Sequence, residues 1–287
     1  MSRHLFSFGH GYSAQALTDI IQPLGWRITG TTRSSDKALK LRNSGIDCLV
    51  VPNQDITGSL ETATHFLTSA GPAENGDPFL NTYKDQLKAV AGNLEWVGYL
   101  STTGVYGDHA GGWVDETTSL APSTKRGQAR VEAEAQWRDF AQDCGLNLKI
   151  FRLAGIYGPG RGPFVKVRAG TAKRIIKDNQ VFSRIHVEDI AQVLLASINR
   201  PQSSQIFNVC DDFAAPPEDV IGYAAELLNA PIPPAVPFET AEMTPMARSF
   251  YAESKKVKND RIKSELDVAL RYPDYKVGLK AMLALED

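Results

Sequence analysis

Short apolar segments alternate with helical patterns through the first two-thirds of the chain, and this alternation constrains the fold most strongly. The apolar segments lie at residues 5–8, 26–29, 48–51, 65–68, 96–100 and 148–153, and one more follows at 206–209. Between them, apolar residues recur at helical spacing, with long helices expected at about 81–95 and 126–143. Short apolar strands joined by amphipathic helices form a parallel sheet, and right-handed crossovers make such a sheet doubly wound. The sequence therefore predicts an α/β fold with helices on both faces of a parallel sheet.

The composition is that of an ordinary globular chain. Of its 287 residues 22% are charged and 43% hydrophobic, and the formal net charge of -2 gives no reason to expect a nucleic acid or an acidic membrane as partner. No apolar stretch approaches the roughly 18 residues of a membrane span. Residues 1–5 lead into the first strand without a signal-peptide pattern. Cys48, Cys144 and Cys210 have neither zinc-site nor disulfide-framework spacing. We therefore expect a cytoplasmic protein without a metal.

The segment GHGYSA at residues 9–14 follows the first strand and opens a helix. Gly9 permits a tight turn, Gly11 lets the backbone approach a pyrophosphate, and Ala14 allows close packing of helix on sheet. The free N–H groups of Tyr12 and Ser13 at the helix start attract an anion. We interpret this segment as the dinucleotide-binding loop of a Rossmann sheet. The alternative is an ordinary glycine-containing turn between a strand and a helix.

The end of the second strand indicates which dinucleotide binds. NAD-binding chains usually have Asp or Glu there, whereas this chain has Thr32 and Arg33 and no acid before Asp36. A guanidinium beside hydroxyl groups suits a 2′-phosphate, so we expect NADP in preference to NAD. The alternative is that Arg33 is only a solvated loop residue. Small residues after later strands complete the candidate cofactor site: Ala70, Gly71 and Ser101.

The regular alternation ends at about residue 158, and the segment 230–245 is rich in proline. We therefore expect two regions. Residues 1–157 together with 183–209 form the NAD(P)-binding Rossmann domain. Residues 158–182 together with 210–287 form a smaller substrate-binding region at the C-terminal end.

Four segments resemble the extended short-chain dehydrogenase/reductases of the epimerase/dehydratase type. LSTTGVYGD at 100–108 resembles their S-[ST]-x-x-V-Y-G-D, and FRLAGIYGPG at 151–160 resembles R-P-x-x-V-Y-G-P-G. RIHVEDIA at 184–191 and FNVCD at 207–211 resemble R-I-H-V-x-D-[IL]-A and Y-N-V-x-D. The resemblance implies that the Thr102 hydroxyl orients the reacting oxygen of a substrate. It also implies a homodimer formed through the two long helices.

The same family carries a Tyr-x-x-x-Lys pair about twenty residues after this segment, where Tyr acts as acid/base and Lys lowers its pKa. At the corresponding positions this chain has Arg126 and Arg130, and no Tyr lies between Tyr106 and Tyr157. Arg stays protonated at neutral pH and is a poor acid/base. The two arginines, one helical turn apart, either form a cationic face that binds a carboxylate, a phosphate or the cofactor, or point to solvent.

Three other residues could replace the missing acid/base or bind the substrate. Tyr106 and Tyr157 lie in segments that the family places beside the substrate, and His186 is the one well-placed imidazole. Each also has a structural interpretation, as a packing tyrosine or a hydrogen-bonded core histidine. The catalytic candidates are therefore Thr102, Arg126, Arg130 and Tyr106, and the substrate-binding candidates are Tyr157 and His186.

Two functions are consistent with these residues. The first is an NADP-dependent oxidoreductase or epimerase-like enzyme that acts on a small nucleotide-sugar or carbonyl compound with non-standard acid/base residues. The second is a non-catalytic NADP-binding redox sensor or partner-binding protein that kept the fold and lost the chemistry.

Overall fold

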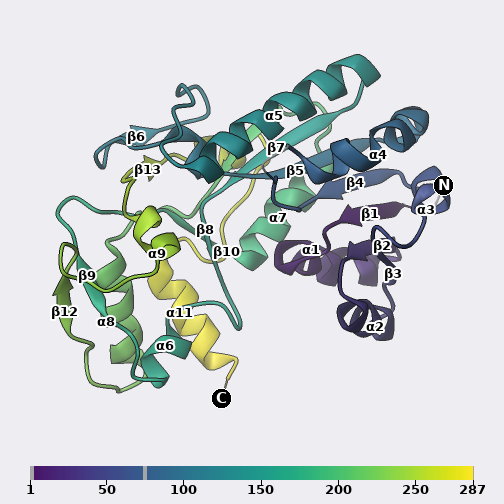
Figure 1. Cartoon of the computed structure of the whole chain (residues 1–287). Helices are drawn as coiled ribbons and strands as arrows, with labels where there is room; N and C mark the ends of the chain where they lie inside the picture. The colour runs from purple at the N-terminus through teal and green to yellow at the C-terminus, as the bar shows by residue number, and fades with distance from the viewer. Residues whose placement is uncertain (1–2, 74–75, 287) are drawn as a thin grey trace.

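The computed structural model of the chain describes residues 3–73 and 76–286, so the outermost residues of the two expected regions and residues 74–75 lie outside the described part (Figure 1). Seven strands form one parallel sheet in the order β11-β7-β5-β4-β1-β2-β3. They are β1 (His4–Phe8), β2 (Arg27–Thr32), β3 (Asp47–Val50), β4 (His65–Thr68), β5 (Trp96–Thr102), β7 (Leu148–Leu153) and β11 (Ile206–Val209). These strands confirm the predicted α/β fold. The strand order reverses between β1 and β4, which places a crevice at the carboxyl ends of those two strands.

The two faces of the sheet carry separate hydrophobic cores. Side chains alternate along a strand, so Leu5 faces one core and Phe6 the other, and Leu67 and Phe66 divide in the same way. Both faces are therefore covered, and this explains why the strands are continuous apolar segments rather than alternating ones. The stacked rings of Phe6 and Phe66, with centroids 5.9 Å apart, lie in the second core.

Helices from different parts of the sequence cover each face. The first face is covered by α1 (Tyr12–Ile21), α2 (Ser35–Asn43), α7 (Val187–Ile198) and α10 (Asp260–Ser264). The second is covered by α3 (Thr57–Glu61), α4 (Pro78–Ala89) and α5 (Lys125–Cys144). Short 3₁₀ turns follow three elements: η1 (Gln22–Leu24), η2 (Ala91–Asn93) and η3 (Thr103–Tyr106).

Both long helices expected from the sequence are present, but α4 ends at Ala89 rather than near residue 95, and a 3₁₀ turn follows it. The Asp77 carboxylate accepts hydrogen bonds from the N–H groups of Phe79 and Leu80, so α4 begins at Pro78. Thr124 caps α5 by accepting from the N–H of Gly127, and Gly145 ends that helix in the left-handed conformation.

A smaller region lies beyond the carboxyl ends of the strands (Figure 1). Its core is formed by α6 (Phe164–Arg168), α8 (Pro217–Leu227) and α11 (Tyr275–Ala284). Two short strands, β9 (Arg174–Ile176) and β12 (Ala235–Pro237), pair beside α8, and α9 (Pro245–Phe250) follows. Two further pairs join this region to the large sheet: β8 (Gly155–Tyr157) with β10 (Arg184–His186), and β6 (Trp113–Val114) with β13 (Lys256–Val257).

The chain returns to the large domain before its end. Val257, Ile262, Leu266 and Val268 pack in the first core of the large sheet, although residues 210–287 were expected in the smaller region. The helix α10 packs against β11, which is an edge strand of the sheet, and Arg261 donates a hydrogen bond to the Ile206 carbonyl. Edge strands need such a cover. In the described residues, this short stretch therefore packs on the large sheet.

In the part of the chain that the structure describes, no helix combines the length and the apolar character that crossing a membrane requires.

The packing of α1 on the sheet predicts a measurable stability difference. Leu17 on α1 is fully buried, whereas Leu39 on α2 is 59% exposed. We expect Leu17→Ala to lower the free energy of unfolding by about 2–5 kcal/mol and Leu39→Ala to change it by less than about 0.5 kcal/mol. Urea titration followed by circular dichroism measures both. Equal effects of the two substitutions would contradict the assigned core.

Candidate functional site

A cavity of about 1700 Å³ lies between the carboxyl ends of the sheet and the smaller region. Its walls come from segments far apart in the sequence: the glycine loop before α1, the ends of β4 and β5, the first turn of α5, and parts of residues 153–184 and 242–257. In doubly wound folds, ligands bind at this edge of the sheet. The cavity is large enough for a dinucleotide together with a small molecule.

The glycine loop has the geometry that a pyrophosphate needs. Gly9 has φ +72°, and a Cβ there would lie 3.0 Å from the backbone nitrogen of Ala70, so a side chain would be strained and crowded. The Gly9 N–H donates to the Thr31 hydroxyl at 2.9 Å, and the Ser69 hydroxyl donates to the Gly9 carbonyl at 2.5 Å. These contacts hold the turn in place. Gly11 precedes α1 without a side-chain cap, so the first N–H groups of that helix stay available to an anion.

The other predicted residues of this loop either line the cavity or pack between α1 and the sheet. Tyr12 and Ser13 line the cavity with Gly11, while Ala14 is fully buried between α1 and the sheet. The Tyr12 hydroxyl donates to the Pro159 carbonyl at 2.9 Å, which ties the glycine loop to the segment after β8. Gly158 permits this approach, because a Cβ there would lie 2.6 Å from the Tyr12 hydroxyl.

The end of β2 presents a guanidinium and no carboxylate. Thr32 accepts a hydrogen bond from the Ser34 N–H at 3.2 Å, which shapes the turn into α2. Arg33 is exposed and forms no hydrogen bond or ion pair with any residue that the structure describes. Lys37 donates to the His10 carbonyl in the glycine loop at 2.5 Å and adds a second positive charge nearby. Next to the crevice, Gly71 lines the cavity, whereas Ala70 lies behind Gly9.

Thr102 lies at the end of β5 on the cavity wall. Its hydroxyl oxygen accepts the Gly104 N–H at 3.2 Å, which leaves the hydroxyl hydrogen free to donate to a ligand. The adjacent Ser101 also reaches the wall, but its hydroxyl donates to the Glu134 carboxylate at 2.5 Å. The Ser101 side chain therefore supports α5, and only its backbone is available to a cofactor.

The structure corrects the prediction of a catalytic role for Tyr106. This side chain is fully buried in the first core and does not line the cavity. Its hydroxyl donates to Asn208 at 2.7 Å and accepts from Arg152 at 2.9 Å. Burial raises the pKa of Tyr106 to about 12. A hydroxyl with both partners supplied by the protein and no access to the cavity cannot transfer a proton to a substrate.

The structure also corrects the prediction that His186 binds the substrate. Its ring is buried, lies 3.9 Å from the Tyr272 ring centre, and caps α7 by accepting from the Glu188 N–H at 3.3 Å. Burial lowers the pKa of His186 to about 4. His186 does not reach the cavity wall, and its imidazole closes the start of a helix.

Tyr157 lines the cavity and is largely buried. Its hydroxyl is directed to the Asp274 carbonyl, at 3.4 Å, and burial raises its pKa above the ordinary range. The ring also fills the space above Gly278, where a Cβ would lie 2.2 Å from the Tyr157 hydroxyl. Tyr157 can contribute an apolar surface to a ligand, and its hydroxyl is held by the smaller region.

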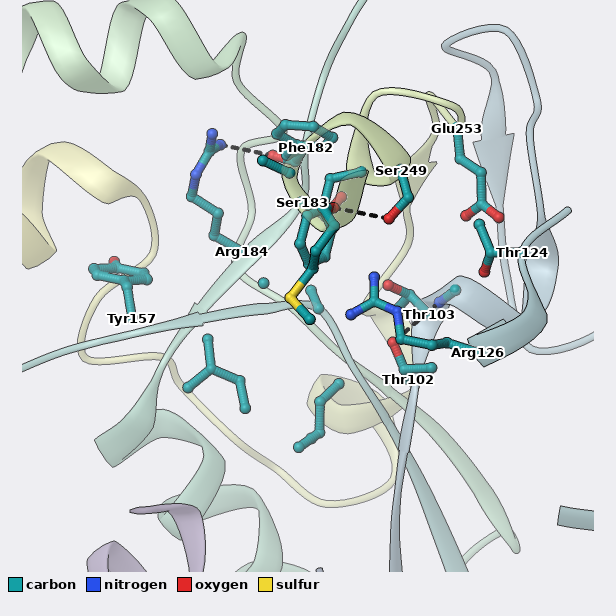
Figure 2. A pocket seen from close by; sticks show the side chains of 18 of the residues that line it. Thr102, Thr103, Thr124, Arg126, Tyr157, Phe182, Ser183, Arg184, Ser249 and Glu253 are labelled. Carbon is teal, nitrogen blue, oxygen red and sulfur yellow. Dashed lines mark hydrogen bonds between the residues drawn. The ribbon is translucent and has the colours of Figure 1, made fainter. Parts of the chain in front are cut away.

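Arg126 and Arg130 line the cavity but do not form a single cationic face. Arg130 donates from one nitrogen to the Tyr99 hydroxyl at 3.0 Å and to the Leu100 carbonyl at 2.9 Å. Arg126 instead extends from α5 into the cavity (Figure 2). Its guanidinium lies over the Phe250 ring, 4.6 Å from the ring centre. Arg130 therefore anchors α5 to β5, and Arg126 presents its charge to the cavity.

Several cavity residues were not predicted from the sequence. Figure 2 shows Phe182, Ser183 and Arg184 across the cavity from Thr102, with Ser249 near Ser183 and Glu253 beside Thr124. Arg184 opens the motif RIHVEDIA at residues 184–191, which could have marked it as a site residue. Its guanidinium donates to the Phe182 and Ala215 carbonyls. Ser249 and Phe250 belong to α9, whose sequence carries no motif that marks a binding site.

Comparison with known proteins gives a consistent result. Residues 87–210 match the NAD dependent epimerase/dehydratase family. A conserved protein of unknown function from Silicibacter pomeroyi DSS has a solved structure that is 56% identical, covers 99% of both chains and has a TM-score of 0.94. Protein YeeZ of Escherichia coli K12 is 29% identical over 216 residues, which are 70% of this chain and 75% of that protein. The UDP-glucuronic acid 4-epimerase of Bacillus cereus, solved in complex with NAD, is 12% identical, covers 98% of this chain and 96% of its own, and has a TM-score of 0.76.

Residues 87–210 thus match the family that the sequence motifs resemble, and the whole chain has the fold of the solved UDP-sugar epimerases. In this chain the first turn of α5 presents Arg126 to the cavity, and no Tyr occurs between Tyr106 and Tyr157. Within residues 3–73 and 76–286, no cluster of three or more His, Cys, Asp or Glu side chains is placed to hold a metal ion.

The buried His186 predicts a pH dependence of stability. Its pKa is about 4 in the folded protein and 6.5 in the unfolded chain, so the unfolded chain binds more protons between these values. The free energy of unfolding therefore falls as the pH is lowered from about 6.5 to 4. His186→Asn keeps a helix-capping acceptor and removes the titration, so we expect a shallower decline in urea titrations across this window. An unchanged decline would contradict the buried neutral imidazole.

Proposed function

We propose that the protein is an NADP-dependent oxidoreductase or epimerase-like enzyme of an atypical branch of the superfamily, acting on a small molecule. One observation carries this proposal: a single cavity joins the glycine loop, the Thr102 hydroxyl and the wall of the smaller region. A non-catalytic dinucleotide module needs only the first of these. The space between Thr102 and residues 182–184 suits a substrate.

The glycine loop, and the end of β2 outside the residues that line the cavity, carry groups that suit a dinucleotide phosphate. The uncapped start of α1 and the absence of a side chain at Gly9 and Gly11 suit the pyrophosphate. All N–H donors of Arg33 are available to a ligand. The end of β2 has no acid of the kind that binds the ribose 2′-hydroxyl of NAD. A 2′-phosphate would form charge-assisted hydrogen bonds with this guanidinium, which supports NADP in preference to NAD.

The residues at the reaction centre support binding and orientation more than proton transfer. When bound, the nicotinamide would supply or accept a hydride. The Thr102 hydroxyl would orient the reacting oxygen of the substrate, and Tyr157 would contribute part of an apolar wall. With Tyr106 and His186 engaged inside the protein, the proton would move through water or through a non-standard residue of the cavity.

A specific observation favours a second function, that of a non-catalytic NADP-binding sensor or partner-binding protein. The hydroxyl of Tyr106 is occupied by core hydrogen bonds, that of Tyr157 is directed to a backbone carbonyl, and Arg126 and Arg130 cannot act as acid/base at neutral pH. Both functions require cofactor binding, and turnover distinguishes them. For either function we also propose a homodimer through α4 and α5.

The cofactor preference can be tested with a charge substitution. We expect Arg33→Gln to weaken NADPH binding by roughly 10–100-fold and to leave NADH binding nearly unchanged, because only NADPH has the 2′-phosphate. Calorimetry with both dinucleotides measures this. The control is Lys40→Gln, which removes one exposed positive charge from α2 and should have little effect. Equal losses for NADPH and NADH would contradict the assignment, and no binding of either to the unaltered protein would refute the proposed function.

The catalytic proposal can be tested by turnover. We expect oxidation of NADPH, followed by absorbance, with at least one member of a panel of sugar nucleotides, aldehydes and ketones. Thr102→Val should then lower kcat/KM by roughly 10²-fold or more and leave the NADPH affinity unchanged. A rate that Thr102→Val does not alter would contradict the role of this hydroxyl. If no compound of the panel causes NADPH oxidation although NADPH binds, the sensor function is favoured.

A further inference from the structure

We propose that Arg126 binds an oxyanion of the substrate, a carboxylate or a phosphate, and holds it beside Thr102. This inference rests on the proposed function, since it names the chemical class of the molecule that the same cavity takes. The residue that replaces a family tyrosine would then select acidic substrates rather than move a proton.

The position of Arg126 places its charge at the reaction centre. It lies in the first turn of α5, and that turn packs against the loop after Thr102: a Cβ on Gly127 would lie 2.9 Å from the Gly104 carbonyl oxygen. Figure 2 shows the guanidinium extending from α5 into the cavity, above Thr102 and Thr103 and toward Ser249. A group held by Arg126 is therefore adjacent to a group held by the Thr102 hydroxyl.

Arg126 has its hydrogen-bonding capacity available. In the described part of the chain, no residue forms an ion pair with it or accepts a hydrogen bond from it. The central carbon of its guanidinium lies over the Phe250 ring, 4.6 Å from the ring centre, in a cation–π contact. The planar group carries five N–H donors, which can meet two oxygens of a carboxylate or a phosphate. Phe250 thus contacts the guanidinium and offers its N–H groups no oxygen acceptor.

The charges around Arg126 leave it without an acidic partner from the chain. Glu253, which lies beside Thr124 in Figure 2, pairs with Lys255 at 2.7 Å and accepts from the Ser123 hydroxyl at 2.7 Å. The other two acids of the wall, Glu132 and Glu242, form no ion pair with Arg126. The positive end of the α5 dipole adds to the same potential. An oxyanion brought by the substrate is therefore the missing partner of this guanidinium.

The test measures oxyanion binding directly. Inorganic phosphate and malonate are titrated by calorimetry into the NADPH-saturated protein at constant ionic strength, so that the probes cannot enter the dinucleotide site. Uncharged malonamide is the control probe. The variants are Arg126→Gln, Arg126→Lys, Phe250→Leu and, as a matched control, Arg138→Gln, an exposed arginine of the same helix outside the cavity.

We expect the unaltered protein to bind at least one anion and not malonamide. Arg126→Gln should weaken that binding at least 10-fold, Arg126→Lys less, and Phe250→Leu several-fold through loss of orientation. Arg138→Gln should bind as the unaltered protein does. Preference for malonate or for phosphate identifies the carboxylate or the phosphate as the recognised group.

Two results would overturn the inference: no binding of either anion to the unaltered protein, or equal binding by the unaltered protein and Arg126→Gln. The NADPH affinity of every variant is measured first, together with its thermal unfolding. If the unaltered protein does not bind NADPH, the proposed function is refuted. The inference about Arg126 is then tested by comparing anion binding by the unaltered protein and by Arg126→Gln, both without NADPH.

Discussion

A buried ion pair between Arg152 and Glu134 holds the helix α5 on the sheet. The Arg152 guanidinium donates to both carboxylate oxygens of Glu134, at 3.1 and 2.8 Å, and both side chains are nearly inaccessible to solvent. Ser101 donates to the same carboxylate, and Tyr106 accepts from the same guanidinium. One network therefore joins β5, β7, η3 and α5. Removing one partner from such a pair leaves an uncompensated buried charge, which costs about 3–5 kcal/mol.

This network determines which polar groups remain for function. It occupies the hydroxyl groups of Ser101 and Tyr106, although both lie in a segment that the family places beside the ligand. By fixing α5 along β5, it also brings the first turn of that helix to the loop after Thr102. The Thr102 hydroxyl and the Arg126 guanidinium are the groups that this arrangement turns toward the cavity. The binding chemistry of the site thus follows from how its core is held together.

The parallel sheet and the glycine loop could be predicted because their signals are local. Apolar strand segments and a glycine at φ +72° depend on a few neighbouring residues. The roles of Tyr106 and His186 could not, because each depends on partners distant in sequence: Asn208 and Arg152 for Tyr106, and the Tyr272 ring for His186. The same reason explains the different orientations of Arg126 and Arg130, which the sequence spacing alone would place on a shared face. The wall formed by α9 lies in the smaller region, where no motif constrained the prediction.

We propose that the cavity binds a dinucleotide at the glycine loop and holds its nicotinamide near Thr102 and Arg126. A crystal structure of the protein with NADPH would show where the dinucleotide lies. We expect the pyrophosphate at the N–H groups of Tyr12 and Ser13, the 2′-phosphate at Arg33, and the nicotinamide in the cavity near Thr102. A dinucleotide bound elsewhere, or one whose nicotinamide points away from Thr102 and Arg126, would contradict it.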